Sequence, residues 1–192
     1  KICDEKLDFS ESLLQAQQSG FAESDPHLDI SGADAASKLS ILLAHAYGVI
    51  VTPDRLLKKG ITSINGDDRS LGEGNGWRIK LVAQAYKFRN GKIAALVLPQ
   101  YLDSGNQLYH VNNEYNGVVI ESALSDRQFL FGKGAGRFPT TSAVISDISA
   151  LRYHYRYEYR KIRKTEKPEL TADYFLRIYV NFPAGSSPGF DT

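Results

Sequence analysis

Hydrophobic residues change their spacing near residue 90 of this 192-residue chain. Before that point, residues 31–47 repeat apolar side chains at intervals of three and four, which places them on one face of a helix. Ser31 can cap the start of this helix and Gly48 can end it. Weaker patterns predict helices over 10–18, 77–88 and 139–151. The core candidates on the helices at 31–47 and 139–151 are Ala35, Leu39, Leu42, Leu43, Ala46, Ala143, Ile145, Ile148 and Leu151.

After residue 90 the chain reads as strands. The segments 92–102, 107–122 and 127–136 are rich in β-branched and aromatic residues, and Asn90-Gly91 is a hairpin signal ahead of them. Helices followed by strands predict an α+β domain, in which helices cover one face of a mainly antiparallel or mixed sheet. A further strand is expected at 173–182, where apolar and polar residues alternate.

Composition excludes several classes of function. The net charge is +1, the single cysteine cannot form an internal disulfide, and no apolar run is long enough to span a membrane. The run 152–164 alternates aromatic and basic residues, which could stack nucleic-acid bases. A strand with one packed aromatic face explains the same alternation and fits the charge better. The four histidines lack the spacing of metal ligands. We therefore expect a soluble cytoplasmic protein that binds neither nucleic acid, nor membrane, nor metal.

An acidic loop leads into the helix at 31–47. Asp34 and Lys38 are four residues apart, so their side chains should share a half-buried stripe beside the apolar face. A lysine held by a carboxylate can transfer a proton to or from a hydroxyl or carbonyl oxygen. Glu23 and Asp29, on the preceding loop, could bind the ammonium group of a small substrate. Spacing alone favours the alternative, an exposed ion pair whose acid complements the helix dipole.

The same residues carry a resemblance. The stretch "GFAESDPHLDISGADAASKLSIL" is similar to the substrate-site signature of homoserine dehydrogenases, with Gly, aromatic, Glu, Asp-Pro, Asp, Gly, Asp and Lys at matching spacing. The segments "GITSI", "IKLVAQA", "VNNEYNGVVI" and "GKGAGRFPTTSAVISDI" follow in the order of the family, so the resemblance covers about 7–148. One departure is Phe21, where the family usually has tyrosine.

The resemblance implies an activity and a site. The family interconverts L-homoserine and L-aspartate 4-semialdehyde with NAD or NADP, in threonine, methionine and isoleucine biosynthesis. By position, Glu23 and Asp29 would bind substrate, Lys38 would bind it and polarise or protonate its oxygen, and Asp34 would orient Lys38.

A glycine-rich loop, "GKGAG", precedes the helix at 139–151. Its glycines would let the backbone approach an anion at the helix N-terminus, and a tight strand-to-helix turn explains them equally well. The resemblance implies that Gly134, Ala135 and Gly136 contact the cofactor.

The domain organisation is also an expectation from the resemblance. Residues 1–153 would form the catalytic domain, which binds substrate and pairs with a second copy in a homodimer or higher homo-oligomer. Residues 154–192 would be a linker and the start of an ACT-like regulatory segment, although an extra edge strand explains 173–182 equally well. The 192 residues contain no dinucleotide fingerprint, so the cofactor would be held mainly by an N-terminal Rossmann domain and the isolated chain would be inactive. The alternative is a non-catalytic module for dimerisation or amino-acid sensing.

Overall fold

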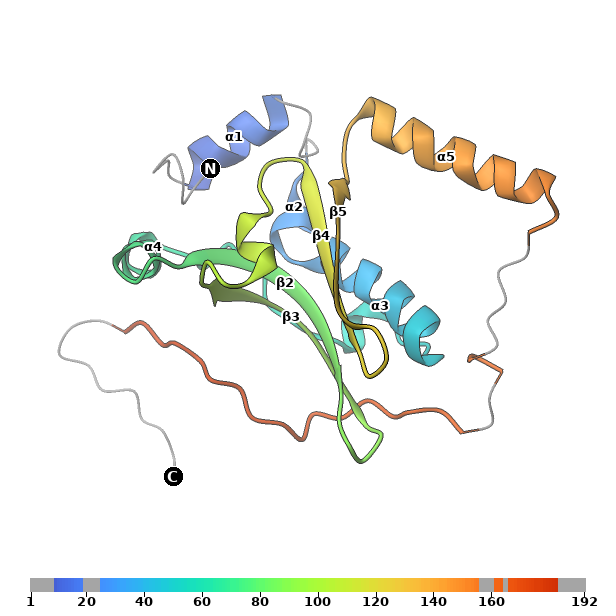
Figure 1. Cartoon of the computed structure of the whole chain (residues 1–192). Coiled ribbons are helices and arrows are strands. Elements are labelled where there is room, and N and C mark those ends of the chain that lie inside the picture. Colours follow the sequence, from blue (N-terminus) through green and yellow to red (C-terminus); the bar gives the residue numbers. More distant parts are fainter. Residues whose placement is uncertain (1–8, 19–24, 156–160, 164–165, 183–192) are drawn as a thin grey trace.

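The structure is a computed structural model that describes residues 9–18, 25–155, 161–163 and 166–182 (Figure 1). In chain order, the elements are α1 (Phe9–Gln18), α2 (His27–Ile30), α3 (Ala33–Tyr47), the 3₁₀ turn η1 (Pro53–Arg55), β1 (Leu57–Lys58), α4 (Gly66–Gly74), β2 (Arg78–Lys87), β3 (Ile93–Leu102), the 3₁₀ turn η2 (Gln107–His110), β4 (Tyr115–Ser122), β5 (Asp126–Lys133) and α5 (Arg137–Arg152). The helices α1 to α4 come before the long strands, and α5 follows them.

The strands form two separate sheets. In the first, β3 lies between β1, which is parallel to it, and β2, which is antiparallel, so the strand order is β1-β3-β2. The second is the antiparallel pair β4 and β5, in which Tyr115 lies opposite Lys133. The predicted α+β class with a mixed sheet is therefore confirmed, as is the hairpin at Asn90-Gly91, where Gly91 has a φ of +84°.

The core lies between α3 and the three-stranded sheet. Leu39 and Leu43 of α3 pack against Ile93 and Val97 of β3, and all four side chains are buried. Ala36 rather than Ala35 is fully buried on this helix, whereas Leu42 and Ala46 are exposed. The buried residues 36, 39 and 43 form a narrower stripe than predicted, because the sheet covers only one side of the helix.

The helix predicted over 77–88 is wrong. These residues form β2, which pairs with β3 along its whole length, from Arg78 opposite Leu102 to Lys87 opposite Ile93. The tight turn at Gly91 brings the two segments side by side, and the ladder of backbone hydrogen bonds outweighs the weak helical spacing. The helix in this region is α4, which Asn65 and Asp68 begin with a capping box.

The helix predicted over 139–151 is present as α5, but it begins at Arg137, and its expected core residues Ile145, Ile148 and Leu151 are exposed. In Figure 1, α5 lies away from the three-stranded sheet. No residue of α5 is buried within the described part of the chain. The pattern identified the helix but not what it packs against.

The C-terminal segment differs from its prediction. Residues 173–182 form no strand, so the strand expected there is wrong, and the ACT-like start expected for 154–192 stays a prediction. Just before these residues, Leu170 pairs with Ile93 of β3 through one parallel bridge. Ile93 donates its N–H to the Glu169 carbonyl at 2.8 Å, and the Thr171 N–H donates to the Ile93 carbonyl at 2.9 Å. The run 152–164 lies partly outside the described residues. None of the described helices is both long and apolar enough to cross a bilayer.

Gly48 gives a prediction about stability. It ends α3 at a φ of +75°, and a Cβ there would collide with the backbone carbonyl of Lys161. We expect Gly48→Ala to lower the free energy of unfolding by about 1–3 kcal/mol, because alanine is strained at this φ and the neighbouring chain must move. Urea unfolding followed by circular dichroism measures the change.

Gly74→Ala is the matched control for Gly48→Ala. Gly74 lies in α4, and a Cβ there would meet no atom within 4 Å. This variant should keep or slightly raise the stability, since alanine favours a helix over glycine. Equal stability of the two variants would contradict the account of Gly48.

Candidate functional site

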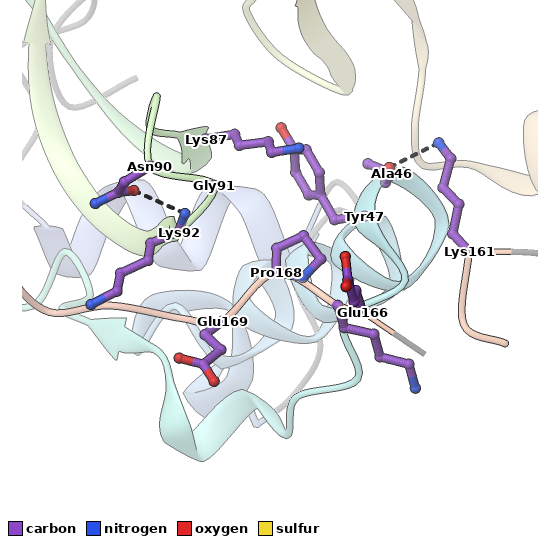
Figure 2. A pocket seen from close by; sticks show the side chains of 11 residues that line it. Ala46, Tyr47, Lys87, Asn90, Gly91, Lys92, Lys161, Glu166, Pro168 and Glu169 are labelled. Carbon is purple, nitrogen blue, oxygen red and sulfur yellow. Dashed lines mark hydrogen bonds between the residues drawn. The ribbon is translucent and has the colours of Figure 1, made fainter. Parts of the chain in front are cut away.

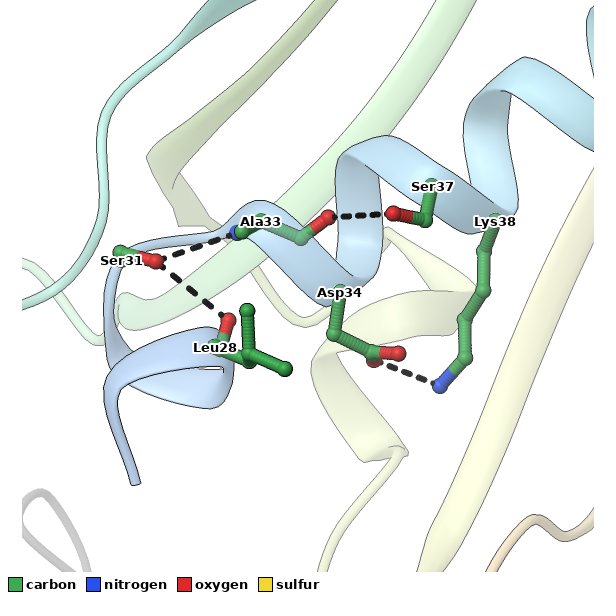
Figure 3. A network of polar contacts seen from close by, with 6 residues as sticks. All are labelled: Leu28, Ser31, Ala33, Asp34, Ser37 and Lys38. Carbon is green, nitrogen blue, oxygen red and sulfur yellow. Dashed lines mark hydrogen bonds and ion pairs between the residues drawn. The ribbon is translucent and has the colours of Figure 1, made fainter. Parts of the chain in front are cut away.

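The start of α3 is shaped by a turn from α2. Gly32, at a φ of +79°, is the N-cap of α3, one residue after the predicted cap Ser31. The Ala33 N–H donates to Ser31 Oγ at 3.4 Å, and Ser31 Oγ donates to the Leu28 carbonyl at 3.5 Å (Figure 3). A Cβ on Gly32 would lie 3.4 Å from Val97 Cγ1, so the turn packs closely on β3. The sheet thereby fixes where the first turn of α3 begins.

Asp34 and Lys38 form the predicted pair on the first turns of α3. Lys38 Nζ lies 2.7 Å from Asp34 Oδ2, and Figure 3 shows both side chains extending on the same side of the helix. The Lys38 side chain is 64% exposed and the Asp34 side chain is 44% exposed. The half-buried position expected for Lys38 is therefore wrong for this chain on its own. The pair presents an ammonium and a carboxylate at the surface, where a substrate or another polypeptide segment can reach them.

The two predicted substrate-binding acids have different outcomes. Asp29 lies on α2, directly before α3, and its side chain is exposed. The α2 helix is held in place by a hydrogen bond from the Ile61 N–H to the Ile30 carbonyl at 2.9 Å. Glu23 lies outside the described residues. The structure thus places Asp29, Asp34 and Lys38 on two consecutive helices that contact each other.

A surface groove of about 530 Å³ lies elsewhere on the molecule. Figure 2 shows it between the end of α3, the β2–β3 turn and the segment 166–169, with Lys161 Nζ donating to the Ala46 carbonyl at 2.8 Å. None of the predicted site residues lines it. We therefore do not assign the substrate site to this groove.

The glycine loop connects β5 to α5. The Gly134 N–H donates to the Glu114 carbonyl at 3.0 Å, and a Cβ on Gly134 would overlap the Asn116 side chain. Gly136 is the N-cap of the 16-residue helix α5 at a φ of +112°, which favours glycine. Gly134 and Gly136 are exposed and Ala135 is half-buried, so backbone N–H groups at this helix start can meet an anion.

An ion pair beside this loop was not foreseen. Lys133 Nζ lies 2.8 Å from Glu114 Oε1, and the ammonium lies 5.5 Å from the centroid of the Tyr115 ring. The hydrogen bond from Lys133 lowers the pKa of the Glu114 carboxyl most, and a hydrogen bond from the backbone N–H of Glu114 lowers it further. The same contact raises the pKa of the Lys133 ammonium. The two residues are 19 positions apart, so only the pairing of β4 with β5 could have revealed them.

The Glu114 pair predicts a pH dependence. Because folding lowers the pKa of Glu114, its contribution to stability is present above the ordinary value of 4.5 and is lost as the pH falls through the folded pKa. We expect the stability of the wild-type chain to fall more steeply than that of Glu114→Gln between neutral and acidic pH. Urea unfolding at a series of pH values measures this difference. Parallel curves for the two proteins would contradict the prediction.

Comparison with known proteins identifies the family. Residues 1–149 match the family model "Homoserine dehydrogenase". The homoserine dehydrogenase of Lactococcus lactis is 38% identical over 149 residues, covering 77% of this chain and 34% of the relative. That of Bacillus subtilis is 33% identical over 196 residues, covering 97% of this chain and 45% of the relative.

Solved structures agree with the sequence matches. A homoserine dehydrogenase from Thiobacillus denitrificans superimposes with a TM-score of 0.76 at 30% identity, covering 88% of this chain and 41% of that one. The S. aureus enzyme at pH 6.5 gives 0.73 at 32% identity, covering 82% and 40%. The fold is thus the mixed α+β domain of a group of dehydrogenases. The chain belongs to the homoserine dehydrogenase family, and it spans less than half the length of these relatives.

Within the described residues, no group of three or more His, Cys, Asp or Glu side chains is arranged to hold a metal ion. The charged side chains that α2 and α3 present at the proposed site are the carboxylates of Asp29 and Asp34 and the ammonium of Lys38. Such groups bind a small zwitterion and move a proton.

Proposed function

We propose that this chain supplies the substrate half of a homoserine dehydrogenase, which interconverts L-homoserine and L-aspartate 4-semialdehyde with NAD or NADP. The observation that carries the proposal is the Asp34–Lys38 ion pair, with Nζ and Oδ2 2.7 Å apart on the first turns of α3. It occurs within the residues that match the family model. A similar archaeal homoserine dehydrogenase, 31% identical with a TM-score of 0.62 and covering 79% of this chain and 42% of that one, was solved in complex with NADPH.

Each residue of the site has a role in the proposal. Asp29, with Glu23, binds the ammonium group of the amino acid, because carboxylates accept charge-assisted hydrogen bonds from it. Lys38 donates a hydrogen bond to the reacting oxygen, and Asp34 holds the lysine side chain in that orientation. In the reducing direction, the aldehyde carbon gains a hydride and its oxygen gains a proton from Lys38, which yields the alcohol. When bound, the nicotinamide cofactor supplies that hydride.

The cofactor half of the site is proposed at Gly134, Ala135 and Gly136. The exposed N-terminus of α5 fits an anionic group, and the φ of +112° at Gly136 turns the backbone into the helix without a side chain in the way. The same features suit a plain strand-to-helix turn. The 192 residues contain no dinucleotide fingerprint, so we propose that residues outside them hold most of the cofactor.

The proposal also covers organisation. We infer that the catalytic domain ends near residue 153, where α5 ends, and that it forms a homodimer or higher homo-oligomer in the cytoplasm. Exposed apolar residues on α5 and on the sheets offer surface for contacts with other domains or copies. Light scattering of the purified chain measures the number of copies.

Two measurements test the function. First, isotope-labelled chain is titrated with L-homoserine, with D-homoserine as control. Binding should shift the amide signals of Asp29, Asp34 and Lys38 with the L form only. Second, the 192 residues replace the matched segment of the B. subtilis relative. This chimera should oxidise L-homoserine with NAD or NADP. A chimera that binds L-homoserine without oxidising it would instead favour an amino-acid-sensing module.

A further inference from the structure

The proposed substrate-binding residues and the proposed cofactor-binding loop are attached to different sheets. Asp34 and Lys38 are on α3, which packs against β2 and β3 of the three-stranded sheet. The glycine loop follows β5 of the two-stranded sheet. The chain passes from one sheet to the other through η2 and the residues 111–114, which lead into β4. A reaction between groups on α3 and groups on the glycine loop requires a fixed geometry between the two sheets, to which this connection can contribute.

Two cationic residues of β2 donate hydrogen bonds to that connection. Lys80 Nζ donates to Asn112 Oδ1 at 3.0 Å and also to the Val111 carbonyl. Arg78 Nη1 donates to the same Asn112 Oδ1 at 3.0 Å, while its guanidinium lies 4.7 Å from the centroid of the Tyr109 ring. The hydrogen bonds are partly buried and join residues more than 30 positions apart. Such bonds from charged donors are shorter and stronger than neutral ones.

The turn that begins at Asn112 connects these contacts with β2 to the glycine loop. Its carbonyl accepts the Tyr115 N–H at 3.2 Å, which closes a turn that contains Asn113 at a φ of +56°. Glu114 of the same turn accepts the Gly134 N–H on its carbonyl at 3.0 Å, and its side chain pairs with Lys133. Hydrogen bonds and the backbone of the turn at 112–115 therefore connect β2 to the start of the loop at 134–136.

We propose that Arg78 and Lys80 are positioning residues, which hold the turn at 111–114 and through it set the place of the Gly134–Gly136 loop relative to α3. The effect of these residues on catalysis rests on the proposed function, whereas their effect on the position of the loop does not. Both residues act on the loop through Asn112, and neither is assigned a contact with substrate or cofactor.

Amide hydrogen exchange of the 192-residue chain, measured by NMR, tests the physical part. In Lys80→Met and in Arg78→Gln, the Tyr115 and Gly134 amides should exchange about 10-fold faster or more, because the turn opens locally. The amides of Val82 and Val97 in the three-stranded sheet should keep their rates. Lys80→Arg, which retains a charged donor, should restore most of the protection.

Two outcomes would overturn the inference. One is unchanged exchange at Tyr115 and Gly134 in both variants. The other is equal acceleration at Val82 and Val97, which would mean that the substitutions act through global stability.

Kinetics of the chimera give a second readout. Lys80→Met should raise KM for NAD or NADP by about 10-fold with little change in KM for L-homoserine, and Lys80→Arg should reverse this. An inactive chimera with the expected exchange rates would refute the proposed function alone, whereas an active chimera with unchanged exchange would refute the positioning role alone.

Discussion

Replacing Lys38 by alanine is expected to lower kcat/KM for L-homoserine by about 10²–10⁴-fold in the chimera, which is the range for loss of a proton-transferring group. The ammonium of Lys38 is held 2.7 Å from Asp34 and is exposed enough to meet a substrate oxygen. Without it, the oxygen loses the donor that the proposed function assigns to it as the hydride moves. Steady-state kinetics in both directions measure the loss.

The same substitution should barely affect folding. The pair is an exposed contact between residues four apart on a helix, and such pairs contribute about 0.3–0.5 kcal/mol. Lys92→Ala is the matched control, since this lysine is also exposed but lies in the β2–β3 turn. Normal turnover by Lys38→Ala, or an equal loss in Lys92→Ala, would refute the catalytic role. A loss of activity that accompanies unfolding would refute it as well.

Replacing Leu43 by alanine is expected to lower the free energy of unfolding by about 2–5 kcal/mol, because the leucine side chain is fully buried and leaves a cavity. Leu43 belongs to the cluster that joins α3 to Ile93 and Val97. A loss of this size is a large fraction of the total stability of a small domain, which is about 5–15 kcal/mol. Urea unfolding followed by circular dichroism measures it.

Leu42→Ala provides the internal control for Leu43→Ala. The two leucines are neighbours on α3, but Leu42 is 48% exposed and Leu43 is 0% exposed. The exposed leucine should give a loss well below that of the buried one, because only part of its surface leaves water on folding. Equal losses at the two positions would show that Leu42 is covered in the folded protein, for instance by another copy or domain.

Hydrophobic spacing predicted much of the fold. The α3 helix, its end at Gly48, the strand β3 and the hairpin at Gly91 could be read from local patterns. These features depend on neighbours within a few residues, so propensity and spacing were sufficient. Whether residues 77–88 form a helix or a strand depended on another segment, β3. The helical spacing of these residues was weak, and their pairing with β3 makes them a strand.

The candidate site shows the same division. The spacing of Asp34 and Lys38 predicted their contact correctly, because residues four apart on a helix always face the same side. The exposed ion pair that spacing alone favoured is what the structure shows, whereas the half-buried stripe was wrong for Lys38, because exposure depends on what covers the helix. Glu114 with Lys133, and Arg78 and Lys80 with Asn112, join residues 19 to 34 positions apart and had no local signal.

For this protein, the sequence by itself determined the α+β class, the main helix, the hairpin and the acid–lysine pair, since each follows from contacts within a few residues. It also carried the motifs that place the chain in its family. Only the tertiary structure decided that β2 is a strand, how wide a stripe of α3 is buried, and how α3 and the glycine loop are connected through Asn112. The physical reason is that these features depend on pairs of segments far apart in the chain, whose meeting no local pattern records.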